Sequence, residues 1–186
     1  MSNPGKPSIV TYGDYEVITP PHTLRSAVTE LPPGAEADDA VARAELALSE
    51  LSENFPAWMN AECERLEDAR AAIHRSGFLP QTRDGLFHAA HDIKGEATTF
   101  GFPAVTDIAR SLCRLIEHTL EMKDIPRELV DQHVDAIRAI VRESARGDVT
   151  DLALALTRRL RDVTEEFLAT SNRHRPDYLR DVIQTG

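Results

Sequence analysis

Residues 91–101 contain the side chains of this chain that are best suited to chemistry. They read His-Asp-Ile-Lys-Gly-Glu-Ala-Thr-Thr-Phe-Gly. A neutral imidazole, with a pKa of about 6.5, is a competent nucleophile near neutral pH without the activating base that a serine needs. His91 could therefore form a phosphoramidate. The ammonium of Lys94, one helical turn further on, could neutralise the added negative charge.

Helical periodicity around this stretch separates an apolar face from the face that carries His91. The apolar residues recur four, three, four and three positions apart: Leu86, Ala90, Ile93, Ala97 and Phe100. At about 100° per residue, His91 lies roughly 140° from the centre of this face. Its neighbours within about 60° are Lys94, Gly95 and Thr98. We therefore expect the imidazole to face solvent beside the ammonium.

Gly95 lies inside the predicted helix, where glycine costs about 1 kcal/mol relative to alanine. A bare surface one turn after His91 would offset that cost. With no side chain at this position, a phosphoryl group and the backbone of a partner could approach the imidazole closely.

The pattern H-x-[IL]-K-G, with another glycine six residues later, resembles the motif of histidine phosphotransfer (HPt) domains of two-component phosphorelays. By this resemblance, His91 is the phosphorylated histidine and Lys94 steadies the phosphate. Gly95 and Gly101 keep the site open or let helices pack closely. Many relatives carry two small residues after the first glycine, where this chain has Glu96 and Ala97. Glu96 projects about 140° from His91 and should not block the site.

In many relatives a polar residue about 22 positions after the histidine helps to hold the phosphate. Cys113 occupies that position here, and a thiol is a weak hydrogen-bonding group. We therefore assign this supporting role to Arg110, which lies one turn earlier on the next predicted helix.

Phe87 and His88 precede His91 by four and three residues. Phe87 could form an apolar docking patch beside the reactive ring, together with Thr98, or it could contact the first predicted helix instead. His88 is interpreted as a rim residue or as a hydrogen-bonding neighbour that tunes the nucleophile. Two histidines do not complete a metal site, and the chain lacks the Glu-x-x-His signature of di-iron bundles, so we expect no metal.

The residues suit a phosphoryl carrier, and the resemblance implies that it accepts the group from a receiver-domain aspartate and passes it to another receiver. The resemblance implies that receiver domains and a hybrid histidine kinase are the partners, and that the receiver supplies Mg²⁺, so that the carrier has no cofactor of its own. A histidine kinase is disfavoured because no nucleotide-binding motif is visible. The alternative is a helical adaptor that binds receiver domains without carrying phosphate, and a metal-binding bundle is a third hypothesis.

Composition restricts the classes of partner and the cellular location that the chain could have. The 186 residues have a formal net charge of −10, a pI near 5.1 and 41% hydrophobic residues. This net negative charge opposes sequence-independent binding to nucleic acid, which is also negatively charged. No apolar run approaches the roughly 20 residues that cross a bilayer, and the first residues lack the pattern of a signal peptide, so we expect a cytoplasmic protein. Cys63 and Cys113 are interpreted as reduced thiols at core or boundary positions.

Proline and glycine clusters predict a flexible tail over residues 1–35, in which residues 9–18 form only a weak extended stretch. The first predicted helix has an apolar stripe that recurs every three or four residues: Val41, Ala44, Leu48, Leu51 and Phe55. Five further amphipathic helices are expected over residues 59–76, 80–101, 103–122, 126–146 and 149–167.

The predicted fold is therefore all-α, an antiparallel four-helix bundle with additional flanking helices. The helical domain is placed at residues 36–170, followed by a short tail at 171–186. Six helices with short connections can cover one another's apolar faces, so we expect a monomer.

Overall fold

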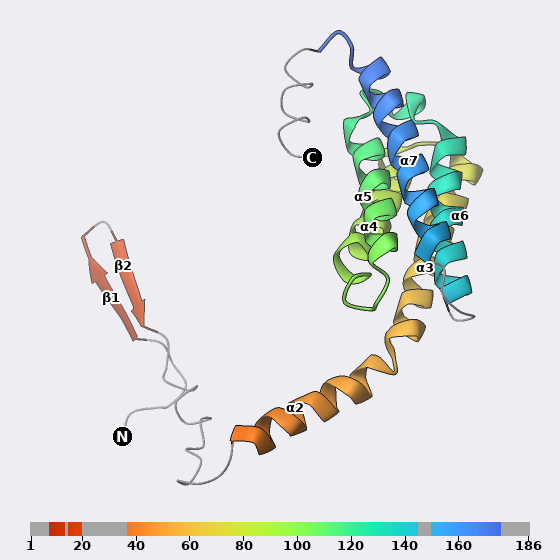
Figure 1. Ribbon diagram of the computed structural model, residues 1–186. Coiled ribbons are helices and arrows are strands. Elements are labelled where there is room, and N and C mark those ends of the chain that lie inside the picture. The colour runs from red at the N-terminus through yellow and green to blue at the C-terminus, as the bar shows by residue number, and fades with distance from the viewer. Residues whose placement is uncertain (1–7, 14, 20–36, 145–149, 176–186) are drawn as a thin grey trace. The chain divides into compact units, whose positions relative to one another are not determined.

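The computed structural model describes residues 8–13, 15–19, 37–144 and 150–175. The chain divides into two compact units, Met1–Ala47 and Leu48–Gly186, and each is described by itself. Figure 1 shows the described helices, which confirm the all-α prediction. They are α2 (Ala37–Ser52), α3 (Phe55–Ser76), α4 (Pro80–Glu96), α5 (Pro103–His118), the 3-10 helix η1 (Met122–Asp124), α6 (Arg127–Ser144) and α7 (Thr150–Ser171).

A small antiparallel hairpin, β1 (Ser8–Tyr12) and β2 (Tyr15–Thr19), was not predicted from the sequence. Val10 is paired with Val17, and Tyr12 with Tyr15, whose rings stack with their centroids 5.3 Å apart. Such cross-strand pairs stabilise a sheet. The sequence analysis treated this segment as part of a tail, but its alternation was the strand signal. The rest of the predicted tail at 1–35, and residues 176–186 of the predicted C-terminal tail, lie outside the described residues.

Four helices of the second unit form a closed ring, in which α4 packs against α3 and α5, and α6 packs against the same two helices. Consecutive helices of the ring are antiparallel. Near one end of the α4–α5 pair, Thr98 Oγ1 lies 2.8 Å from Thr106 Oγ1, and near the other end the guanidinium of Arg83 donates to the carbonyl of Ile116 at 3.3 Å. The predicted four-helix bundle is therefore present.

Helix α7 is the flanking helix, and it packs on α5 and α6. It runs parallel to α5, because the contacts between the two helices advance along both in the same direction. Ser111 donates to Thr164 at 3.1 Å, and the amide of Asn172 donates to the carbonyl of His118 at 3.1 Å.

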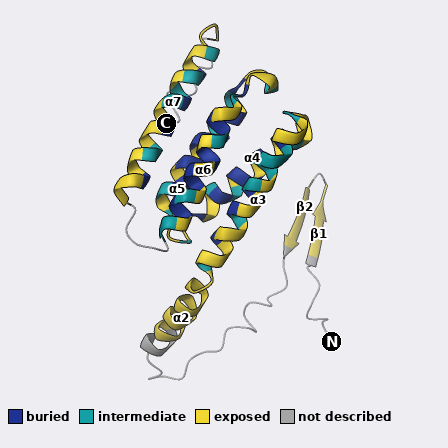
Figure 2. Cartoon of the chain, turned by 90° about the vertical axis from the view of Figure 1, so that its right-hand side faces the viewer, coloured by how far each residue is buried: buried dark blue, intermediate teal, exposed yellow. Residues whose placement is uncertain are grey.

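Buried side chains concentrate on the facing sides of the bundle helices (Figure 2). The largest fully buried residues include Leu66, Leu86, Ile93, Leu112 and Ile137. Cys63 and Cys113 are free thiols in this core, as predicted. Burial raises the pKa of each thiol to about 11, so both remain protonated near neutral pH.

One expectation fails, namely that the six helices cover all of one another's apolar faces. Within the second unit, Leu48 and Leu51 are 63% and 45% exposed, and Leu152, an apolar residue of the helix predicted at 149–167, is 53% exposed. The helical period was read correctly in both cases. Periodicity identifies an apolar face, but it does not identify what covers that face.

Helix boundaries follow local backbone chemistry. Gly77 ends α3 with φ of +80°, a conformation that favours glycine, and its N–H donates to the carbonyl of Ile73 at 2.7 Å. Pro80 then begins α4, and the hydroxyl of Thr82 accepts a hydrogen bond from the backbone N–H of Leu79 at 2.9 Å.

His133 is fully buried where α5, α6 and α7 meet. Its Nδ1 lies 2.7 Å from the carbonyl of Leu129, so Nδ1 carries the proton of the neutral ring and donates it. Its Nε2 lies 2.9 Å from the hydroxyl of Ser111 and 3.4 Å from that of Thr164. Burial lowers the pKa of His133 to about 4.

This burial predicts acid sensitivity. Above pH 6.5 His133 is neutral in both states, but between pH 6.5 and 4 the unfolded chain takes up the proton first, so folding loses about 3 kcal/mol by pH 4. The control is His133→Leu, which leaves the Ser111 and Thr164 hydroxyls bonded to each other. Urea unfolding at pH 7 and pH 4 should show the stability advantage of wild type over the variant shrinking by that amount. An equal advantage at both pH values would contradict the assignment.

Candidate functional site

The apolar face that the sequence predicts for the histidine helix is buried in α4. Leu86, Ala90, Ile93 and Ala97 are each 0% exposed, and Phe100 is half-buried against Phe55 and Trp58. Since this face is fixed in the core, His91 lies on the opposite side and is exposed to solvent. Periodicity alone therefore predicted the orientation of the imidazole correctly.

Two interactions fix the structure next to His91: an ion pair between α3 and α4, and an aromatic contact with the imidazole ring. The carboxylate of Asp92, next in sequence, accepts a hydrogen bond from the guanidinium of Arg65 at 2.6 Å, which joins α4 to α3. On the preceding turn, the half-buried ring of Phe87 lies 5.8 Å from the His91 ring and 6.0 Å from the His88 ring. Phe87 packs against the core, so one apolar ring supports both exposed histidines. The sequence analysis missed the Arg65–Asp92 pair, because pairing between helices leaves no local pattern.

Lys94 lies one turn after His91 and is half-buried. Its positive charge acts on the Cys113 thiol, where it opposes the rise in pKa that burial causes. Cys113 occupies the position that the resemblance assigned to a phosphate-holding residue. Cys113 itself is 2% exposed and protonated, which makes it a poor phosphate ligand.

Gly95 is exposed, and a Cβ atom at this position would meet no atom of the described chain within 4 Å. Internal packing therefore does not explain the glycine. The bare backbone faces outward one turn from His91, as a site for a partner's approach requires.

Gly101 has a conformational role in addition to those that the resemblance suggested. A Cβ on Gly101 would also meet nothing within 4 Å, but its φ is +89°, a conformation that other residues rarely adopt. The next N–H, that of Phe102, donates to the carbonyl of Ala97 at 2.7 Å. Gly101 thus makes the turn from α4 into α5 possible.

The remaining predicted residues lie on the same two helices. Thr98 is exposed, but its hydroxyl is hydrogen-bonded to that of Thr106. Arg110 is exposed and donates to the carboxylate of Asp107 at 2.6 Å on its own helix. Among the described residues, no group of three or more potential metal ligands occurs near His88 and His91 or elsewhere.

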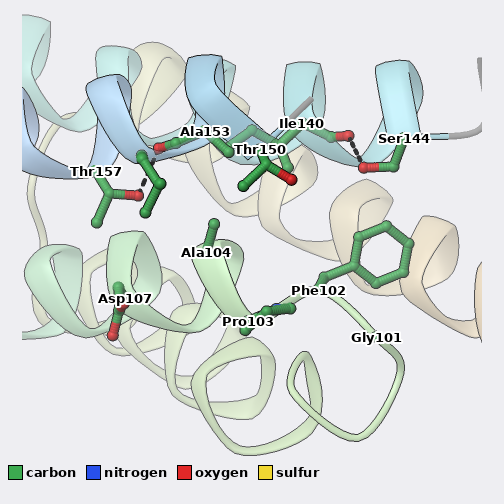
Figure 3. Close-up of a pocket in the computed structure, with 11 residues that line it drawn as sticks. Gly101, Phe102, Pro103, Ala104, Asp107, Ile140, Ser144, Thr150, Ala153 and Thr157 are labelled. Atoms are coloured by element: carbon green, nitrogen blue, oxygen red, sulfur yellow. Dashed lines mark hydrogen bonds between the residues drawn. The ribbon is translucent and has the colours of Figure 1, made fainter. Parts of the chain in front are cut away.

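A shallow cavity of about 380 Å³ lies apart from the histidine, between the start of α5, the end of α6 and the start of α7 (Figure 3). Of the predicted site residues, only Gly101 lines it. The hydroxyls of Ser144 and Thr157 donate to carbonyls of their own helices, at 2.7 and 2.8 Å. The chemistry of the candidate site is therefore on the open surface of α4.

Comparison with known proteins agrees with this geometry. The sequence model that describes the Hpt domain matches residues 35–147. The chain belongs to the Hpt domain family. Membership indicates a phosphotransfer role in phosphorelays, as a phosphoryl-carrying module rather than a catalyst, and interaction with receiver domains and histidine kinases in general. Searches of curated proteins and of solved structures found no match.

The family match includes α2 through α6 and ends before α7. It begins one residue before the predicted start of the helical domain at residue 36, while the predicted end at residue 170 stays a prediction. Within the described part of the chain, no helix is long and apolar enough to cross a membrane.

The variant Gly95→Ala tests whether Gly95 keeps the approach to His91 open in this Hpt domain, because it should change the stability of the fold and the rate of transfer in opposite directions. Alanine should raise the free energy of unfolding by up to about 1 kcal/mol, since it favours the helix and meets no clash. It should also slow phosphoryl transfer from a phosphorylated receiver about tenfold, or about 1.4 kcal/mol, because the new methyl group stands where the partner approaches. Denaturant unfolding and label-transfer kinetics measure the two effects.

Gly85→Ala is the matched control, because Gly85 also lies in α4 with open space at its Cβ position. It should stabilise the fold to a similar degree and leave transfer unchanged. Equal slowing in both variants, or normal transfer by Gly95→Ala, would contradict the access role of Gly95.

Proposed function

We propose that this Hpt protein accepts a phosphoryl group on His91 from the aspartyl phosphate of one receiver domain and donates it to the aspartate of another. The observation that supports this most directly is the exposed His91 imidazole on α4, with Lys94 one turn away and open space at Gly95. A carrier requires this combination, because the reactive atom must reach into the active site of another protein.

The transfer is a substitution at phosphorus. The unprotonated ring nitrogen of His91 attacks the phosphorus atom, a nitrogen–phosphorus bond forms, and the bond to the aspartate oxygen breaks to release the carboxylate. In the return step a receiver aspartate attacks, and the nitrogen–phosphorus bond breaks. Alignment and charge stabilisation dominate such reactions, and we assign the Mg²⁺ that they use to the receiver.

In this proposal Lys94 supplies the positive charge that this chain contributes. Lys94 is half-buried one turn after His91, so its ammonium can neutralise charge on a phosphoryl group bound to the imidazole. Arg110 remains the second candidate, but its guanidinium already binds Asp107. Phe87 supports the His91 ring and adds apolar surface for docking.

The first test follows label from a purified, radiolabelled receiver phosphate to this protein. Wild type should acquire an acid-labile, base-stable label, and His91→Gln should acquire none. His88→Gln is the matched control, because His88 is also exposed, on the same helix, and next to Phe87; it should be labelled like wild type. A wild-type protein that binds several receivers but takes label from none would favour the non-phosphorylated adaptor, as would phosphorelay output that survives in His91→Gln.

The second test compares the two cations. Lys94→Ala should lower the transfer rate about 10- to 100-fold, since a hydrogen bond to a charged group contributes about 1.5–3 kcal/mol. Arg110→Ala should have a smaller effect, because Asp107 already engages Arg110. Single-turnover kinetics with saturating receiver measure both rates. A Lys94→Ala protein that transfers at the wild-type rate would remove Lys94 from the site.

A further inference from the structure

The residue after His91 carries a charge that opposes the proposed transfer. Asp92 follows His91 on α4, about 100° further around the helix, and its side chain is only partly buried. A phosphoryl group adds negative charge to the residue that carries it, and like charges on neighbouring residues repel each other. An unpaired carboxylate at this position would therefore disfavour the arrival of a phosphoryl group on the imidazole.

Arg65 of α3 neutralises this carboxylate. Its Nη2 atom lies 2.6 Å from Oδ2 of Asp92, and this hydrogen bond is the main reason why the pKa of Arg65 is raised above its usual value. The other terminal nitrogen, Nη1, donates to both carboxylate oxygens of Glu62, at 2.8 Å each. Glu62 lies one turn earlier on α3, and its side chain is only 14% exposed. The guanidinium is therefore held from its own helix while it pairs with the residue beside His91.

Stability does not explain the position of this pair. The side chains of Arg65 and Asp92 are 52% and 41% exposed, and exposed ion pairs contribute little to the free energy of unfolding. Helices α3 and α4 also pack through their buried apolar faces, which include Leu66 and Ile93. The distinctive property of the pair is its location next to the nucleophile, where a charge acts on the reaction itself.

We propose that Arg65 is a positioning residue for phosphoryl transfer that acts through Asp92. It cancels the charge of the carboxylate beside His91, so that the positive charge of Lys94 acts on the phosphoryl group unopposed. Arg65 makes no contact with the phosphoryl group in this mechanism, and its effect depends entirely on the presence of Asp92. This inference rests on the proposed function of His91.

Single-turnover transfer from a radiolabelled, phosphorylated receiver, measured at saturating receiver concentration, tests this role. Arg65→Gln should transfer about tenfold more slowly than wild type, because it leaves a bare carboxylate beside the imidazole. Asp92→Asn should transfer at least as fast as wild type, because it removes that carboxylate. The double variant, Arg65→Gln with Asp92→Asn, should recover to within about threefold of wild type, since the two changes are coupled.

Arg138→Gln is the matched control. Arg138 of α6 donates to the carboxylate of Glu67 on α3 at 2.6 Å, and its side chain is 48% exposed, much like that of Arg65. Helix α6 packs on α3 and α5, across the ring from α4. This variant therefore also breaks an exposed ion pair to α3, but far from the nucleophile, and it should transfer like wild type. Circular dichroism should show the same helix content in all the variants.

A role that only joins α3 to α4 gives a different order of rates, because either single substitution breaks the pair. Asp92→Asn would then be as slow as Arg65→Gln, and the double variant would not recover. That result, wild-type transfer by Arg65→Gln, or equal slowing by Arg138→Gln would overturn this inference and leave His91 as the carrier. A wild-type protein that takes no label would instead refute the proposed function, and this inference with it.

Discussion

The rotation of α4 about its own axis is the constraint on which the histidine site depends. Fully buried residues on one side, Leu86, Ala90 and Ile93, fix that rotation against α3 and α5. Successive residues are about 100° apart, so a change of register by one residue would carry His91 toward the core and bury a polar ring without a partner. The apolar packing that stabilises the bundle is thus also what presents the nucleophile.

Contacts at the edges of α4 reinforce this rotation without covering the site. The Arg65–Asp92 pair holds one side of the helix, and the Thr98–Thr106 hydrogen bond holds its C-terminal turn. Exposed ion pairs contribute little to overall stability, so their effect here is on orientation. Further from the site, the buried His133 ties together α5, α6 and α7, which makes the scaffold behind the site sensitive to acid.

The sequence predicted the helices and the exposed position of His91 well, because both follow from strong local signals. The 3.6-residue period located the buried face of α4, and the predicted boundaries at residues 76 and 80 match the end of α3 and the start of α4. What it could not predict depends on partners distant in the chain. The partners of His133 come from three helices, and the exposure of Leu48 depends on which elements pack against α2. The positive φ of Gly101 was not predicted, because it depends on the turn that joins α4 to α5.

The central claim is that His91, alone among the seven histidines of the chain, carries the phosphoryl group. Long-range ¹H–¹⁵N correlation spectra of the imidazole rings, recorded before and after incubation with a phosphorylated receiver, test this directly. The account predicts that the ring resonances of His91 move to phosphoramidate positions, while the buried His133 ring is unchanged. Phosphoramidate shifts on His88 or another ring, or no shift in any ring while the receiver loses its phosphate, would contradict it.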